Sequence, residues 1–141
     1  MPYGGVSAAL VLQLVAMEAG VHADDLASAA GWDEPLEPDL VRATAVVLEA
    51  ALPTLALGAT ERPPAGTSIA LSGRTVDLRF TVVGKGWVSD RTAPITGGVI
   101  GGDDSTVLRF ALGRAGLDER VLTAVGDPDV AQRFKLWFPG P

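Results

Sequence analysis

The segment GATERPPAG, residues 58–66, divides the chain into two halves with different hydrophobic periods. Before it, apolar residues recur at spacings of three and four, which is the period of an amphipathic helix. After it, apolar and polar residues alternate over residues 75–83, which is the period of a half-buried strand. Because Pro and Gly interrupt both kinds of element, the change of period marks a boundary between them. We therefore expect an α+β protein, with a helical hairpin over residues 1–60 packed beside a small mixed β-sheet over residues 61–141 that carries helices on one side.

The first half predicts two antiparallel helices. One covers residues 6–30, with Ser7 as its N-cap and Gly31 at its end, and the next begins at Asp39 and runs to about Leu55. An isolated amphipathic pair of helices leaves an apolar face uncovered, and we expect that face to include Leu10, Leu14 and Leu48. The hairpin therefore predicts a homo-oligomer or another protein partner.

The second half predicts short strands mixed with helices. The strands are expected at Thr67–Leu71, Thr75–Val83, Trp87–Asp90, Thr96–Ile100 and Val121–Val125. Helices are expected from Thr106 to about Leu112, capped by Asp103, Asp104 or Ser105, and from the turn Gly126-Asp127-Pro128 to about Trp137. The aromatic residues of the closing helix are expected to pack onto the sheet.

Charge and rare residues exclude several classes of function. The formal net charge of −6, with basic residues scattered along the chain, disfavours nucleic acid as a partner. The absence of cysteine excludes disulfides, Cys-based zinc fingers and a protein thiol nucleophile, and a single histidine cannot build a site with several His ligands. The first helical stretch contains Gln13, Glu18 and His22 and is not preceded by Lys or Arg, so we read neither a membrane span nor a signal peptide there. We expect a soluble, cytoplasmic protein.

Glu18 and His22 are the residues that most favour chemistry. They are four residues apart and therefore share one face of the predicted helix. Imidazole nitrogen and carboxylate oxygen can bind one divalent metal ion together, and Asp25, three residues further along, can orient the imidazole through its other nitrogen. The alternative is that these side chains form only a solvated polar edge of the helix.

Three segments carry a resemblance to a known family. Residues 18–31 follow the pattern E-x-x-x-H-x-x-D-x-x-x-A-x-G, residues 106–114 read TVLRFALGR, and residues 125–128 read VGDP. In this order, and with Pro2-Tyr3-Gly4 as a preceding turn, they resemble the C-terminal part of the mycothiol-dependent maleylpyruvate isomerases. These enzymes combine a DinB-like metal-binding helical bundle with a C-terminal domain similar to sterol-carrier proteins.

The resemblance implies a metal-assisted thiol chemistry with part of its machinery missing. It implies that Glu18 and His22 are metal ligands, most naturally for zinc, that mycothiol is the thiol cosubstrate, and that Arg114 faces the active site. It also implies that residues 1–60 are the last bundle helix and the helix that follows it, and that residues 61–141 form the sterol-carrier-like domain. The chain departs from the family pattern because it contains no second His to complete the metal site. For Arg114, a favourable charge at a helix C-terminus is the alternative role.

Two functions follow from these observations. One is an isomerase or thiol transferase that depends on a metal and mycothiol, with a third ligand supplied by another subunit or protein. The other is a non-catalytic module, in which the α/β part binds a small apolar molecule or the hairpin docks onto a partner as a dimer or accessory subunit.

Overall fold

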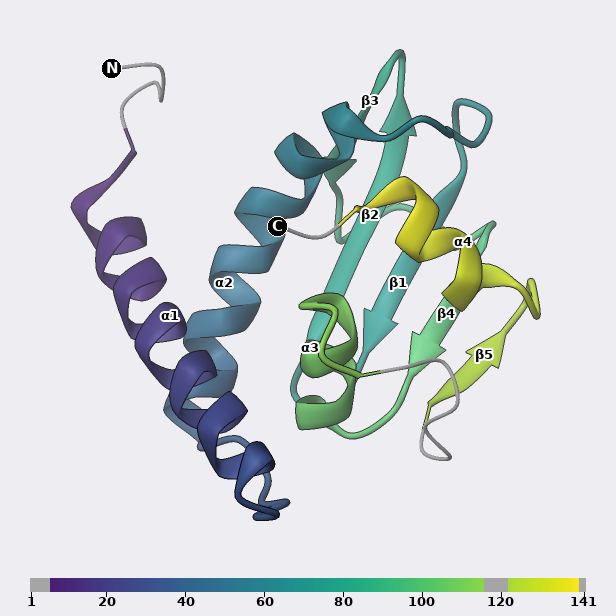
Figure 1. Ribbon diagram of the computed structural model, residues 1–141. Helices are drawn as coiled ribbons and strands as arrows, with labels where there is room; N and C mark the ends of the chain where they lie inside the picture. Colours follow the sequence, from purple (N-terminus) through teal and green to yellow (C-terminus); the bar gives the residue numbers. More distant parts are fainter. Residues whose placement is uncertain (1–5, 116–121, 140–141) are drawn as a thin grey trace.

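The computed structural model describes residues 6–115 and 122–139 and has the predicted α+β architecture (Figure 1). Pro2-Tyr3-Gly4 and Val121, which carry sequence predictions, lie outside the described residues. The helices are α1 (Ala8–Ala29), α2 (Pro38–Leu55), the short 3-10 helix η1 (Ala56–Gly58), α3 (Asp104–Ala111) and α4 (Val130–Trp137). The strands are β1 (Ser68–Ser72), β2 (Asp77–Val83), β3 (Gly86–Ser89), β4 (Gly98–Gly101) and β5 (Thr123–Val125).

The sheet is mixed, as predicted. Its order is β3-β2-β1-β4-β5, with β1 parallel to β4 and the other neighbours antiparallel. In β2 the apolar residues Leu78, Phe80 and Val82 are buried, while the residues between them are more exposed, so the alternation in the sequence does mark the inner face. Figure 1 shows α2, α3 and α4 on the same side of the sheet.

Aromatic side chains fill the space between the sheet and the closing helix. Phe134 and Phe138 are almost fully buried, and the Phe138 ring lies 5.6 Å from that of Phe80 and 4.9 Å from that of Trp87. Trp137 packs on Trp87 at 5.7 Å. The end of the chain therefore packs onto its own sheet, as the sequence predicted.

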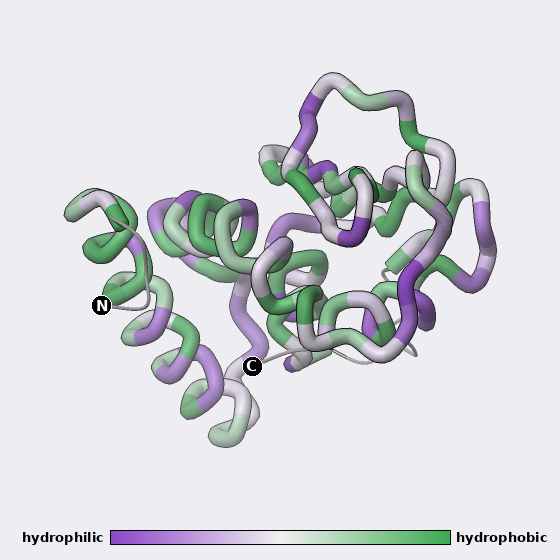
Figure 2. The backbone as a smooth tube through the Cα atoms, turned by 90° about the horizontal axis from the view of Figure 1, so that it is seen from above, coloured by the Kyte–Doolittle hydropathy of each residue, from purple (hydrophilic) through white to green (hydrophobic). Residues whose placement is uncertain are grey.

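Helix α1 lies at the edge of the molecule, and α2 lies between it and the sheet (Figures 1 and 2). The predicted N-cap of α1 is confirmed, since the Ser7 hydroxyl accepts a hydrogen bond from the Leu10 amide at 3.2 Å. The predicted uncovered face was partly wrong. Leu48 is 4% exposed and belongs to the core, and Leu10 packs against that core. Only Leu14, at 42%, is substantially exposed.

Helix α2 connects the hairpin to the sheet. It buries six residues against a core shared with the strands: Val41, Ala43, Thr44, Val47, Leu48 and Leu52. The stretch Pro38–Gly58 is also long and apolar enough to cross a membrane by length and composition alone. Core helices of globular folds meet the same criterion, and α2 has that role here.

Two helix starts differ in detail from the prediction. Of the three candidate caps of α3, Asp103 is the one used: it accepts a hydrogen bond from the Thr106 amide at 2.9 Å. Helix α4 begins at Val130 and not near Pro128, because Asp127 accepts a hydrogen bond from the Asp129 amide at 2.9 Å and forms a separate turn.

Candidate functional site

The predicted metal-binding pair lies on the exposed side of the C-terminal half of α1. The Nε2 atom of His22 is 3.6 Å from Oε2 of Glu18, and its Nδ1 atom is 3.7 Å from Oδ2 of Asp25. Both distances exceed a good hydrogen bond, so these are loose contacts. The two ring nitrogens of His22 therefore face different carboxylates. Its side chain is 67% exposed and accessible to a ligand.

The spacing of Glu18 and His22 fits one zinc ion. Two ligand atoms bound at about 2.0–2.1 Å with tetrahedral angles are separated by about 3.3 Å, slightly less than the distance observed between Nε2 and Oε2. Asp25 faces the opposite nitrogen and suits the orienting role better than that of a third ligand. Within residues 6–115 and 122–139, no group of three or more His, Cys, Asp or Glu residues is arranged to hold a metal. Glu18 and His22 therefore have no third ligand beside them among the described residues.

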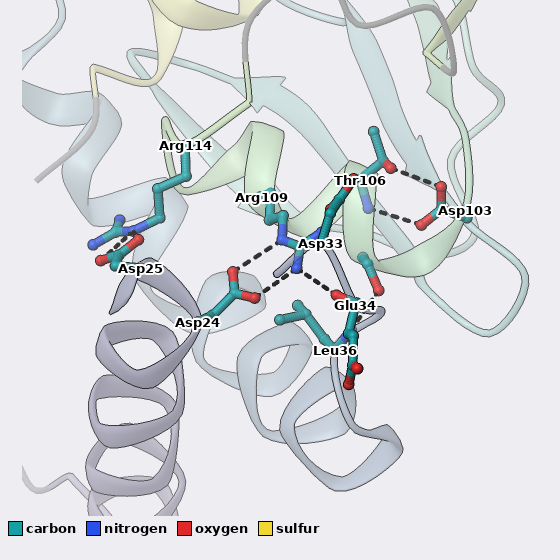
Figure 3. Close-up of polar contacts among 10 residues, drawn as sticks. Asp24, Asp25, Asp33, Glu34, Leu36, Asp103, Thr106, Arg109 and Arg114 are labelled. Carbon is teal, nitrogen blue, oxygen red and sulfur yellow. Dashed lines mark hydrogen bonds and ion pairs between the residues drawn. The ribbon is translucent and has the colours of Figure 1, made fainter. Parts of the chain in front are cut away.

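Arg114 contacts Asp25, the carboxylate that faces Nδ1 of His22, and Figure 3 shows the contact between Arg114 and Asp25. Its Nε atom donates to Oδ1 of Asp25 at 2.9 Å, and its Nη1 atom donates to the Leu112 carbonyl at 3.0 Å. The turn after α3 brings it there. Gly113 adopts φ of +78°, which glycine accommodates without strain, and the chain then turns toward α1. The structure thus brings together all four residues singled out from the sequence: Glu18, His22, Asp25 and Arg114.

A second Asp–Arg pair beside it was not singled out from the sequence. Arg109 on α3 donates from Nε to Oδ2 of Asp24 at 2.9 Å and from Nη2 to Oδ1 at 2.5 Å (Figure 3). Its Nη2 atom also donates to the Glu34 carbonyl at 2.7 Å. The hydrogen bonds to Asp24 raise the pKa of Arg109. In the sequence, this pairing is indicated only by two adjacent acids, Asp24 and Asp25, and by two arginines in or just after α3, Arg109 and Arg114.

The loop between α1 and α2 is fixed on the start of α3. The buried Ser105 hydroxyl accepts a hydrogen bond from the Leu36 amide at 2.8 Å. At the same helix end, burial raises the pKa of Asp103, but hydrogen bonds from the Thr106 hydroxyl and amide outweigh it, so the net pKa is lowered. Together with the Asp24–Arg109 pair, these contacts hold α1, the loop and α3 together next to Glu18 and His22.

A groove of about 690 Å³ lies between α1 and α2, away from the His22 pair. Its floor includes the small residues Ala16, Gly20 and Ala23 of α1, and Trp32 stands at its end. Trp32 is 70% exposed, so it is not part of the aromatic core. Two further pockets of about 580 Å³ each are also lined partly by residues of the hairpin.

The comparisons with known proteins do not assign the chain to a family. No protein-family model matches the chain, and no curated protein or solved structure matches it. The resemblance to the maleylpyruvate isomerase family thus rests on the motifs of residues 18–31, 106–114 and 125–128 alone.

Proposed function

We propose that Glu18 and His22 bind one zinc ion as half of a site that another chain completes, and that this site supports metal-assisted thiol chemistry of the kind catalysed by mycothiol-dependent maleylpyruvate isomerases. The observation that carries the proposal is that each ring nitrogen of His22 faces a different carboxylate. Nε2 lies 3.6 Å from Glu18, at a separation suited to shared metal binding, while Nδ1 faces Asp25. We place this activity in the cytoplasm, with mycothiol as the thiol.

Each residue has a separate task in this chemistry. Zinc supplies Lewis acidity, which lowers the pKa of a bound thiol and makes it nucleophilic near neutral pH. Asp25 faces Nδ1 of His22 at 3.7 Å and would accept its N–H when a metal is bound, so that Nε2 presents its lone pair beside Glu18. Arg114 fixes Asp25 from the other side, and its side chain, 32% exposed, offers a guanidinium that would bind a substrate carboxylate. The thiolate would then add to a double bond of that substrate conjugated to a carbonyl, and the π electron pair would move onto the carbonyl oxygen. After rotation about the resulting single bond, the electron pair would return and expel the thiolate, which leaves the isomerised double bond and the unchanged thiol.

Zinc binding measured by calorimetry, together with the metal content of the purified protein, tests this proposal. We expect binding by the wild type, its loss in His22→Ala, and an affinity about tenfold lower in Asp25→Asn, because orienting carboxylates commonly contribute that much. Glu37→Gln is the matched control, since Glu37 is an exposed carboxylate away from His22. Absence of zinc above background in the wild type, or equal binding by His22→Ala, would refute the proposal.

A second candidate function is a non-catalytic interaction module, in which the hairpin docks as a dimer or accessory subunit. It is favoured by the outer face of α1, where Leu12 is 70% and Leu26 is 74% exposed. Soluble proteins rarely leave such side chains uncovered along a whole helix. A protein that self-associates but takes up no zinc would support this function over the first.

A further inference from the structure

The outer face of α1 carries a heptad seam over its entire length. The seam is defined by the positions whose spacing alternates between four and three: Ala8, Leu12, Val15, Ala19, His22, Leu26 and Ala29. Alternating spacings of three and four are the pattern by which two helices pack side by side. Every seam residue except His22 is apolar, and His22 is one of the two proposed zinc ligands.

Nothing in the described chain covers this seam. All seven positions are exposed, and the larger residues Leu12, Val15 and Leu26 are 61–74% exposed. Helix α2 packs on the opposite side of α1, where Met17 and Val21 are buried. Figure 2 shows α1 at the outer edge, with the rest of the molecule on one side of it. The seam is therefore free to receive a helix from outside.

The charges of α1 favour an antiparallel partner of the same sequence. Residues 6–17 contain no charged side chain, whereas Glu18, Asp24 and Asp25 give the C-terminal half of α1 its negative charge. Two parallel copies would place the acidic halves next to each other. Two antiparallel copies place the acidic half of each beside the uncharged half of the other, which reduces like-charge repulsion and opposes the helix dipoles.

We propose that α1 of one chain pairs in antiparallel orientation with α1 of a second copy, along this seam, and that the two copies of His22 meet near the two-fold axis. This inference deepens the proposed zinc function and rests on it for the shared metal, because it names a second copy of this chain as the source of the missing ligand.

Side-chain sizes define a register for the pairing. When Ala19 faces His22 of the second copy, Val15 faces Leu26 and Leu12 faces Ala29, so small residues lie opposite larger ones in two of the three layers. In this register the two His22 residues are offset along the axis by about 4–5 Å, from a rise of about 1.5 Å per residue. At that offset both imidazoles, together with Glu18, can reach one zinc ion.

The expected association is modest without metal. A helix of 22 residues is about 33 Å long, so one seam covers less than the roughly 800 Å² per partner of a standard stable interface. We expect a dissociation constant of about 10 µM for the metal-free protein, and at least about tenfold tighter association with zinc, because only the dimer has the complete ligand set.

Sedimentation velocity from about 1 to about 200 µM, with zinc or with a chelator, tests the pairing. Val15→Glu places a charge in the seam and is expected to leave a folded monomer, with association weakened at least about tenfold. Leu57→Glu is the matched control: Leu57 is 61% exposed but lies in η1, so this variant should dimerise like the wild type. Circular dichroism verifies that both variants fold. A wild type that stays monomeric with and without zinc, or a Val15→Glu variant that dimerises normally, would overturn the inference.

The orientation is tested by disulfide trapping, which is unambiguous because the chain has no cysteine of its own. An oxidised mixture of Leu12→Cys and Ala29→Cys proteins should give the mixed disulfide, since antiparallel helices place these positions within bonding distance. Leu12→Cys homodimers as the main product would show parallel helices and overturn the antiparallel arrangement.

Zinc titration of the same variants separates the two proposals. A wild type that dimerises through the seam but binds no zinc refutes the proposed function and leaves the pairing intact. A monomeric Val15→Glu protein that binds zinc as tightly as the wild type supports zinc binding by Glu18 and His22 but overturns the completion of the site by a second copy of this chain.

Discussion

The pair Asp24–Arg109 should couple α1 to the rest of the fold by about 2 kcal/mol. The two side chains are only 16% and 19% exposed, and Arg109 makes two charge-assisted hydrogen bonds to the carboxylate and one to the Glu34 carbonyl. A hydrogen bond to a charged group contributes about 1.5–3 kcal/mol, and breaking a fully buried ion pair costs about 3–5 kcal/mol. Since the pair retains some contact with solvent, we reduce these values to a coupling of about 2 kcal/mol.

A double-mutant cycle measures this coupling. Asp24→Asn, Arg109→Met and the double variant are unfolded in urea, with the fluorescence of the buried Trp87 and Trp137 as the signal. We expect each single variant to lose about 2–3 kcal/mol of unfolding free energy and the double variant to lose clearly less than their sum.

The pair Asp39–Arg42 on α2 provides the matched control, because it joins the same residue types in the open, with side chains 88% and 70% exposed. Its coupling should be about 0–0.5 kcal/mol. If the Asp24–Arg109 cycle gives no more than this control, the inference that shielding from solvent makes that pair strong is wrong, and α1 is held by its apolar contacts with α2 alone.

Three further substitutions test individual contacts in the core. Burial lowers the pKa of Lys135 from 10.5 to about 8. Between pH 8 and pH 10.5 the unfolded chain therefore binds more protons than the folded one, and the free energy of unfolding should rise with pH, by about 1 kcal/mol after allowance for the partial exposure of Lys135. Urea unfolding curves of Lys135→Met, measured over the same pH range, should lack this rise. Ser105→Ala should cost about 1–3 kcal/mol in urea unfolding because it leaves the Leu36 amide without its partner in a buried place, and a loss below about 0.5 kcal/mol would contradict this. Thr44→Val should have the opposite sign and raise the thermal midpoint, since the Thr44 hydroxyl is fully buried without a hydrogen-bond partner among the described residues, whereas a lower midpoint would mean that it has one.

Local patterns in the sequence predicted the elements well and the choice of helix face less well. The alternation of β2 and the cap at Ser7 are confirmed because each depends on neighbouring residues alone. Helix α1 is apolar on nearly all sides along its N-terminal half, so its period does not distinguish the inner face from the outer one. The buried face contains Met17 and Val21, and the exposed face contains Val11 and Leu12.

The four residues of the predicted site were found from short motifs, but the contacts between them depend on the fold. Asp25 and Arg114 are 89 residues apart, and Asp24 and Arg109 are 85 apart. No periodicity within one helix shows which acid meets which arginine. Arg109 lies within α3 and reaches Asp24, whereas Arg114 follows the turn at Gly113, where φ is +78°, and reaches Asp25.

The two adjacent acids of α1 have different tasks because consecutive helix residues point about 100° apart. Asp24 points toward α3 and the loop, where its pairing with Arg109 is shielded from solvent and holds α1 in place. Asp25 points toward Arg114, whose Nε atom donates to both of its carboxylate oxygens, at 2.9 Å to Oδ1 and 3.2 Å to Oδ2, and the same Oδ2 atom faces Nδ1 of His22 at 3.7 Å. The His22 side chain itself is 67% exposed, so the imidazole is open to a ligand. The end of α1 that Asp24 and Arg109 hold in place is thus the end that carries Glu18 and His22, the proposed zinc ligands. A second helix docked along the seam would therefore meet His22 at a fixed position relative to Arg114.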